Sequence, residues 1–269
     1  MTTDTIIFLH IPKTGGRSLE NILLRKYAKE EALVNVHKQM DVIARWPDER
    51  KRKVRYIQGH FIYGAHRNFP QACKYITMLR DPVDRVISHY YFVKRTVSHP
   101  LHRIVVEQGM DLEAYVTSGI CDEVNNDQTR LVAGVKRDAM VDIGEMLEMA
   151  EANIESSFIV AGLVDQFDET LVLLKRRLGL KNIFYGVRNK TINRPLKESV
   201  PDRTLELISR RNQADIQLYA FAKRRMEEMT RNEGASFERE VRRFKFMNRP
   251  YSYLFHMART TRNKLAGRR

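Results

Sequence analysis

The chain is poor in cysteine and acidic residues and has no long apolar run. Its 269 residues include two cysteines, Cys73 and Cys121, which lie in neither a Cys-x-x-Cys pair nor a metal-ligand cluster. This argues against a disulfide-stapled secreted domain and against a cysteine-based metal centre. No apolar run is long enough to span a bilayer, and no signal peptide precedes the first predicted strand. We therefore expect a cytoplasmic protein.

The shortage of acidic residues leaves a strong positive charge. There are 33 Asp and Glu against 47 Lys and Arg, which gives a net charge of +14 and a pI near 9.8. Such an excess indicates an anionic partner, such as a nucleotide, a polyanionic glycan, nucleic acid or an anionic membrane, although solubilising surface lysines explain part of it. The length and the 43% hydrophobic content fit one substantial α/β domain with a helical appendage.

The chain opens with a predicted strand, a glycine-containing turn and a helix. Residues 6–11 form an apolar, β-branched run, and helical spacing of apolar residues begins at Leu19. A turn of this kind, followed by a helix N-terminus, can bind a phosphate or sulfate through its backbone N–H groups. The alternative is an ordinary corner between a strand and a helix. Between the two elements stand Pro12, Lys13, Thr14, Gly15, Gly16, Arg17 and Ser18.

This turn departs from the Walker pattern of nucleotide-binding P-loops. In that pattern Lys and Ser/Thr follow the last glycine, whereas here Lys13 precedes the glycines and Arg17 follows them. The Ser/Thr that would hold Mg²⁺ is therefore out of register. Ser18 can serve either the anion or the helix as a cap. The pattern favours a phosphate-like group bound without nucleotide–metal machinery.

Three further strands are predicted at residues 54–58, 74–79 and 158–161, the last ended by Gly162. Helical patterns follow Pro82 and cover residues 167–178 and 201–231. The alternation predicts an α/β fold: a P-loop-like parallel sheet flanked by helices, with a helical C-terminal extension. We place the main domain at residues 1–231 and the extension at 232–269. Ligands of such sheets bind beyond the carboxyl ends of the strands, where Lys13, His60 and Arg80 are predicted to lie.

Arg80 and Ser88 form a second candidate anion site. Asp81 and Pro82 suit the start of a helix, and Ser88 lies two turns along it. An Arg and a hydroxyl placed in this way can bind one phosphate. An Asp–Arg ion pair on a solvated helix face explains the same pattern equally well.

The last segment, residues 239–269, holds ten Lys/Arg and one Glu, a local charge of +9. Aromatic and apolar residues are interleaved with these charges. The segment is either a docking surface for anionic glycan, nucleic acid or membrane, or a terminal helix whose aromatic residues pack on the core.

Together these segments resemble the sulfotransferases that use 3′-phosphoadenosine 5′-phosphosulfate (PAPS), and most of all the carbohydrate branch related to heparan sulfate 2-O-sulfotransferase. The resemblance covers most of residues 5–225. Segments 58–61, 125–130, 162–167 and 189–195 also match blocks of that family, in order and spacing.

The resemblance implies a role for each candidate residue. His60 would be the general base that removes the proton of the acceptor hydroxyl. Lys13 would stabilise the bridging oxygen as charge develops there. The 5′-phosphate would be held by Thr14, Gly15, Gly16 and Ser18, the 3′-phosphate by Arg80 and Ser88, and other parts of the nucleotide by Arg17 and Arg194. No metal is implied.

The chain also departs from the resembled enzymes. Gln58 stands where they carry a second His, two residues before the catalytic one, and no membrane anchor is visible. We therefore expect a soluble, bacterial-type member. Its acceptor would be a hydroxyl of a glycan, glycolipid or other molecule, with no nucleic acid as partner and peripheral membrane contact through residues 239–269 left open. The competing hypotheses are a P-loop kinase of a small molecule or sugar, dependent on ATP and Mg²⁺, and a non-catalytic polyanion-binding protein.

Overall fold

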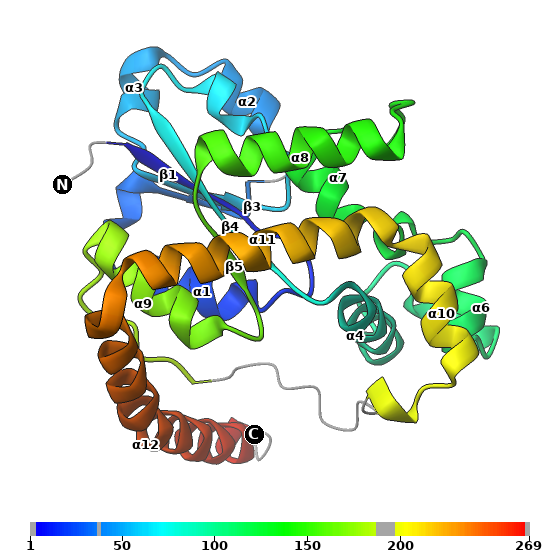
Figure 1. Cartoon of the computed structure of the whole chain (residues 1–269). Helices are drawn as coiled ribbons and strands as arrows, with labels where there is room; N and C mark the ends of the chain where they lie inside the picture. Colours follow the sequence, from blue (N-terminus) through cyan, green and yellow to red (C-terminus); the bar gives the residue numbers. More distant parts are fainter. Residues whose placement is uncertain (1–3, 37–38, 187–196, 267–269) are drawn as a thin grey trace.

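The computed structural model describes residues 4–36, 39–186 and 197–266, and five parallel strands form the centre of this part of the chain (Figure 1). Leu9, at the end of the central strand, pairs with Gly59 on one side and with Thr77 on the other. The predicted parallel α/β sheet is therefore confirmed. The strands lie in the order β2 (Ala32–Val34), β3 (Tyr56–Gly59), β1 (Thr5–Leu9), β4 (Cys73–Leu79) and β5 (Phe158–Leu163).

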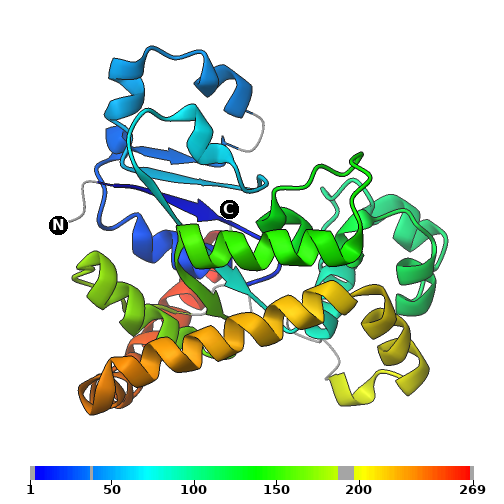
Figure 2. The same ribbon diagram turned by 45° about the horizontal axis from the view of Figure 1, so that its top comes forward.

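Helices cover the sheet, and a group of further helices lies beside it (Figures 1 and 2). In Figure 1, α8 and α11 cross in front of the strands, and both pack against β5. Short 3₁₀ turns occur at η1 (Lys29–Glu31), η3 (Ala65–Asn68), η4 (Asp122–Val124) and η5 (Lys197–Ser199). The α-helices are α1 (Gly16–Leu23), α2 (Met40–Ala44), α3 (Asp48–Arg52), α4 (Pro82–Arg95), α5 (His102–Glu107), α6 (Leu112–Thr117), α7 (Asp127–Ala133), α8 (Ile143–Ser157), α9 (Phe167–Leu178), α10 (Asp202–Arg211), α11 (Gln213–Asn232) and α12 (Gly234–Ala266).

The core explains why these residues form a central strand. Ile6, Ile7, Phe8 and Leu9 of β1 are each at most 2% exposed, so both faces of the strand are covered. A strand buried on both faces tolerates a continuous apolar run and needs no polar alternation. A second apolar cluster joins α4, α5, α6 and α10 beside the sheet.

The observed strand bounds differ from the predicted ones, and a short strand was missed. The runs predicted at 6–11, 54–58, 74–79 and 158–161 are the strands Thr5–Leu9, Tyr56–Gly59, Cys73–Leu79 and Phe158–Leu163. Gly162 does not end β5 but lies inside it. A Cβ at this position would lie 2.2 Å from Thr170 Cγ2 on α9, so only glycine fits here. The glycine thus permits close contact between helix and strand. The edge strand β2 has only three residues, and its sequence carries no signal that would separate it from a loop.

The helix predicted over residues 201–231 is two helices, α10 and α11, which meet at Asn212. Asn212 is fully buried, and its side-chain amide donates to the carbonyls of Val124 and Ile208, with a distance of 2.9 Å in each case. Its oxygen accepts from the N–H of Asn126 at 3.1 Å. These bonds to α10 and to the segment before α7 hold the chain at the break, because asparagine readily satisfies backbone groups outside a regular helix.

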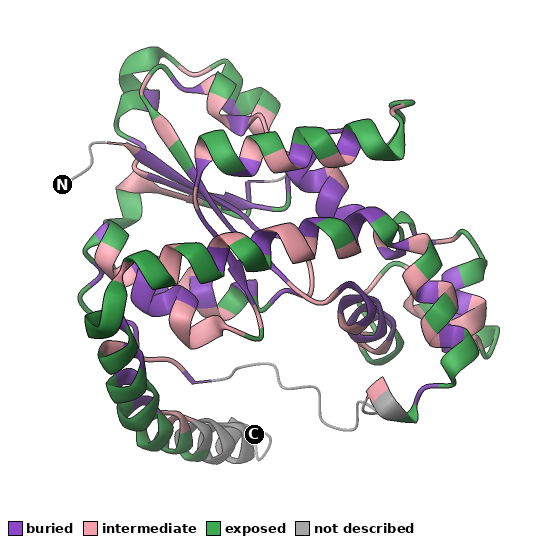
Figure 3. Ribbon diagram, viewed as in Figure 1, coloured by how far each residue is buried: buried purple, intermediate pink, exposed green. Residues whose placement is uncertain are grey.

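The last helix, α12, packs along α9 (Figure 3). Its residues Phe237, Val241 and Phe244 are buried, and Glu240 forms an ion pair with Lys175 at 2.6 Å. α11 ends at Asn232, near the domain boundary placed at residues 231/232, which itself stays a prediction. None of the helices in the described ranges is both long and apolar enough to cross a membrane.

Candidate active site at the ends of β1, β3 and β4

The loop of residues 10–15 joins β1 to α1 and is the centre of the candidate site. Lys13 and Gly15 both have left-handed backbone conformations, with φ of 70° and 73°. The buried Thr14 hydroxyl donates to the carbonyl of Ile11 at 2.8 Å. The loop thereby turns tightly into α1, whose first N–H groups have no partner within the helix. A left-handed non-glycine residue costs about 1–3 kcal/mol, and such strain gathers at functional sites.

Ser18 does not cap this helix. α1 begins at Gly16 with Gly15 as its N-cap, so Ser18 lies inside the first turn, and its N–H donates to the carbonyl of Gly15 at 3.0 Å. The expectation of Ser18 as a cap is therefore wrong. Its role toward an anion stays a prediction.

His60 follows β3 and is tied to this loop by its ring. Its Nδ1 atom lies 2.6 Å from the backbone carbonyl oxygen of His10, and the two imidazole rings are 4.5 Å apart between centroids. Because a carbonyl can only accept, Nδ1 of His60 carries the hydrogen and Nε2 presents a lone pair. His60 is an exposed residue.

Gln58 holds the ring of His10 from the other side. Its side-chain oxygen accepts from the N–H of Asn35 at 3.2 Å, so its amide nitrogen faces Nδ1 of His10 at 2.9 Å. An amide NH₂ group only donates, which places the His10 hydrogen on Nε2. Gln58 is 1% exposed and thus acts inside the fold rather than toward an acceptor.

The environment keeps His10 neutral. Burial, which is the largest cause, together with the nearby His60 and Arg17 lowers its pKa from 6.5 to about 3. The His10 ring also stacks on Phe8, at 5.3 Å between centroids. A Cβ on Gly16 would lie 2.0 Å from this ring. Glycine is therefore needed at position 16 to make room for the His10 ring, whether or not the loop binds an anion.

Arg80 follows β4 and reaches the same loop. Its guanidinium donates to the carbonyl of Lys13 at 3.3 Å. Gln128 fixes the backbone of Arg80 on both sides, since its oxygen accepts from the Arg80 N–H and its nitrogen donates to the Arg80 carbonyl, each at 3.0 Å. The ammonium of Lys13 lies 4.1 Å from the centre of the Phe92 ring, in cation–π geometry.

The buried carboxylate of Asp215 holds the backbone of Gln128, because it accepts from the Gln128 N–H at 3.3 Å. Asp215 on α11 is fully buried and accepts from the N–H and the hydroxyl of Thr129 at 2.7 and 2.8 Å. It also lies 3.5 Å from the guanidinium of Arg85, which is fully buried as well. Arg85 thus pairs in the interior and not on a solvated face of α4. Burial is the largest cause that raises the pKa of Asp215, against the opposing effect of Arg85.

The structure brings most of the predicted residues to one edge of the sheet. Lys13, Arg80 and His60 all meet at the loop of residues 10–15. Ser88 lies on the buried side of α4 with 4% exposure, while Arg17 is exposed on α1. Arg194 lies outside the described residues. The predicted start of α4 is confirmed, since the Asp81 carboxylate accepts from the N–H of Asp84 at 2.9 Å.

Sequence reasoning missed His10 and the role of Gln58. Both are polar residues in or directly after buried strands, and a polar residue in such a run is the signal that would have marked them. Gln128 was recognised only as part of a family block, and its two bonds to Arg80 became visible only in the fold.

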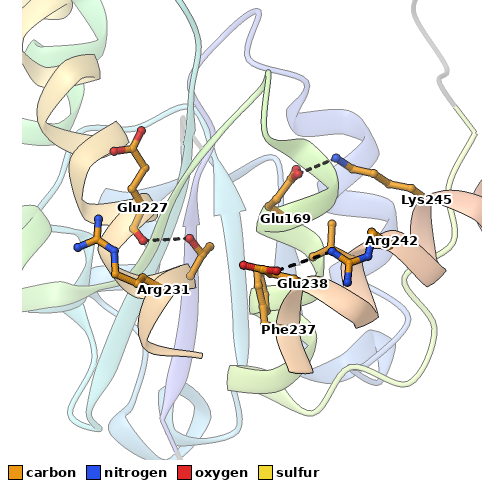
Figure 4. A pocket seen from close by; sticks show the side chains of 9 residues that line it. Glu169, Glu227, Arg231, Phe237, Glu238, Arg242 and Lys245 are labelled. Carbon is orange, nitrogen blue, oxygen red and sulfur yellow. Dashed lines mark hydrogen bonds and ion pairs between the residues drawn. The ribbon is translucent and has the colours of Figure 1, made fainter. Parts of the chain in front are cut away.

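A hollow of about 470 Å³ lies elsewhere, between α9, α11 and α12 (Figure 4), and no predicted site residue lines it. Its charged side chains largely face each other. Lys245 lies 2.6 Å from Glu169, and Arg242 lies 3.7 Å from Glu238. Within residues 4–36, 39–186 and 197–266, no group of three His, Cys, Asp or Glu could hold a metal ion.

Comparison with known proteins finds similarity to sulfotransferases. Residues 1–131 match the model of the sulfotransferase family. A heparin sulfate O-sulfotransferase of Drosophila melanogaster is 26% identical over 250 residues, which cover 81% of this chain and 70% of the fly protein. The uronyl 2-sulfotransferase of Homo sapiens is 20% identical over 259 residues, 85% of this chain and 64% of that protein.

Two further similarities are more limited. A protein-tyrosine sulfotransferase of Arabidopsis thaliana is 31% identical over 103 residues, which cover 36% of this chain and only 20% of the plant protein. Among solved structures, mouse sulfotransferase SULT7A1 complexed with PAP matches with a TM-score of 0.40 and 16% identity, over 78% of this chain and 64% of the mouse chain.

Proposed function

We propose that this chain is a sulfotransferase that moves a sulfuryl group from PAPS to a hydroxyl of a glycan or glycolipid-type acceptor. The class rests on the family match at residues 1–131 and on relatives that are themselves named sulfotransferases. A glycan acceptor is favoured because the relatives matched over most of the chain are named for heparan sulfate or uronyl substrates. The proposal requires no metal ion.

The observation that carries the proposal is the meeting of three side chains at one loop. Lys13 belongs to the loop, Arg80 donates to the Lys13 carbonyl, and His60 donates to the His10 carbonyl. A cation, a second cation and a base around unsatisfied helix N–H groups are the parts that sulfuryl transfer needs.

The residues of the loop suit the 5′-phosphosulfate of the donor. We assign the backbone N–H groups of Thr14, Gly15 and Gly16 to the phosphate, helped by the Ser18 hydroxyl. Lys13 would neutralise the charge that develops on the oxygen bridging phosphorus and sulfur.

The second group of residues suits the 3′-phosphate. Arg80 offers paired N–H donors, and Gln128 holds its backbone in place. Ser88 is the weaker member of this pair because it is 96% buried, so only a small part of its surface can meet a ligand. Arg17 and Arg194 are assigned to the nucleotide on the family resemblance alone.

His60 acts as the general base of the proposed reaction. Its Nε2 lone pair accepts the proton of the acceptor hydroxyl while that oxygen bonds to sulfur. The bond between sulfur and the bridging phosphate oxygen breaks, and 3′-phosphoadenosine 5′-phosphate (PAP) leaves with the electron pair. The proton ends on His60, and the hydrogen bond from Nδ1 to the His10 carbonyl then stabilises the imidazolium.

Thermal unfolding with nucleotides tests the donor site. PAP at 100 times its dissociation constant should stabilise the protein by about 2.7 kcal/mol, whereas AMP should do so far less because it lacks the 3′-phosphate. Arg80→Ala should lose the stabilisation by PAP. Arg103→Ala, an exposed arginine on α5, is the matched control and should keep it. Circular dichroism verifies that each variant is folded.

The same experiment separates the competing functions. Stabilisation by ATP with Mg²⁺ alone would indicate a kinase and contradict the proposal. Absence of stabilisation by any nucleotide, in a folded protein that still binds a sulfated polyanion, would indicate a binding protein without chemistry.

A further inference from the structure

The last helix, α12, has two different sides. Its inner side carries Phe237, Val241, Phe244 and Asn248, which are all buried, and the Asn248 oxygen accepts from the N–H of Tyr185 at 3.0 Å. The helix is therefore fixed to the rest of the protein and presents one defined outer side (Figure 3).

Large apolar side chains lie on this outer side. Phe246 is 77% exposed, Tyr253 66% and Leu254 64%. Their spacing of seven and eight residues places all three on one stripe of the helix, opposite the buried stripe. Scattered single apolar residues are ordinary at protein surfaces, but three on one side of a helix form an apolar ridge, which Arg249 and Pro250 interrupt between Phe246 and Tyr253.

Basic residues surround this ridge. Arg239, Arg243 and Arg249 are exposed on the same helix. Arg242 forms an ion pair with Glu238 at 3.7 Å, in which both side chains are 69% exposed. Salt screens such exposed ion pairs strongly. The outer side of α12 thus combines apolar contact area with a strong positive charge.

We infer that the outer side of α12 docks onto an anionic lipid surface. A helix with an apolar stripe and basic flanks lies in the plane of a membrane interface, with its apolar side chains in the acyl boundary and its cations at the headgroups. A polyanionic glycan would pair with the arginines but would leave Phe246 and Leu254 in water. A second copy of the chain would bring two equally charged helices together, which charge repulsion opposes.

Vesicle co-sedimentation tests this inference independently of any enzymatic turnover. We expect the wild-type protein to bind vesicles of 70% phosphatidylcholine and 30% phosphatidylglycerol, and to bind pure phosphatidylcholine vesicles much more weakly. Phe246→Ser/Leu254→Ser should lower the affinity for the anionic vesicles by about tenfold or more, because two large apolar side chains lose their burial.

A matched control removes apolar surface elsewhere. Val97 and Met140 are 81% and 102% exposed and lie in loops outside α12. Val97→Ser/Met140→Ser should bind anionic vesicles like the wild type. Arg239→Gln/Arg243→Gln/Arg249→Gln should also bind less, and its residual binding should depend less on salt than that of the wild type.

Three outcomes would overturn the inference. One is absence of vesicle binding by a folded wild-type protein. Another is wild-type affinity in Phe246→Ser/Leu254→Ser, with retention on heparin lost only in the arginine variant, which would identify a glycan surface. The third is a change from dimer to monomer in the apolar variant, by light scattering, without a change in vesicle binding.

Discussion

The Nδ1 atom of His60 lies 2.6 Å from the backbone carbonyl oxygen of His10. This contact joins the end of β3 to the first residue after β1, so the loop that turns into α1 also orients the proposed base. It places the hydrogen of His60 on Nδ1, and we propose Nε2 as the atom that accepts a proton. The base and the proposed donor-binding loop are therefore parts of one structural unit.

Replacement of His60 should remove catalysis and spare donor binding. His60→Asn keeps a donor near the position of Nδ1 but has no ring nitrogen that could act as a base. We expect turnover to fall about 10²- to 10⁴-fold, the usual contribution of a general base, in His60→Asn and His60→Ala alike. Thermal stabilisation by PAP should remain. Turnover near that of the wild type in either variant would remove His60 from the mechanism.

Replacement of Gln128 should loosen Arg80. Gln128→Leu removes both hydrogen bonds between Gln128 and the backbone of Arg80, which should cost about 1–3 kcal/mol in the free energy of unfolding. The affinity for PAP, measured by calorimetry on the folded variant, should fall as well, since Arg80 loses its fixed position. Gln213→Leu on the exposed surface of α11 is the control. Unchanged stability together with unchanged PAP affinity would contradict the assigned role.

A side chain at position 16 should collide with His10. Gly16→Ala places a Cβ 2.0 Å from the imidazole, so either the ring or the loop must move. We expect a loss of about 1–3 kcal/mol in the free energy of unfolding by urea, as for other overpacked sites. Gly144→Ala is the control, because its Cβ would meet only the carboxylate of Asp142, at 3.0 Å and on the surface of the protein. Equal stability of the two variants would show that His10 and Gly16 are not tightly packed.

His10 should make the fold sensitive to acid. Its pKa is about 3 in the folded protein and near 6.5 in the unfolded chain, so between these values only the unfolded chain binds the proton. Stability therefore falls as the pH drops below 6.5. From pH 7 to pH 5 the wild type should lose about 2 kcal/mol more than His10→Gln, by urea unfolding. Carboxylates titrate in both proteins, so their effect cancels in the difference between the two. If the stability of the two proteins changed with pH in the same way, His10 would not be neutral and buried.

The strands with long apolar runs were predictable from sequence, and the short or interrupted elements were not. β1 and β4 carry enough buried β-branched and aromatic residues to be recognised by pattern alone. The break at Asn212 depends on bonds to Val124 and Asn126, some 86 residues away or more, which no local pattern encodes. Gly162 reads as a terminator in sequence, yet it serves contact with α9.

The candidate site was predictable where residues follow strand ends. Lys13, His60 and Arg80 come together because parallel strands end at one edge. The support behind them was predictable only in part. Polar residues in buried runs mark His10 and Gln58, but their contact and the bonds of Gln128 to Arg80 depend on side-chain packing between distant segments. The assignments of Ser88 and Arg194 to the donor stay predictions.

Transfer of sulfur-35 from labelled PAPS tests the central claim most directly. The protein would be incubated with EDTA, labelled PAPS and a panel of unsulfated uronic-acid glycans, and the label in the polymer would be counted. We predict labelled glycan with the wild type, despite the chelator, and about 10²- to 10⁴-fold less with His60→Asn. Equal labelling by wild type and His60→Asn, or labelling that EDTA abolishes and Mg²⁺ restores, would contradict the account.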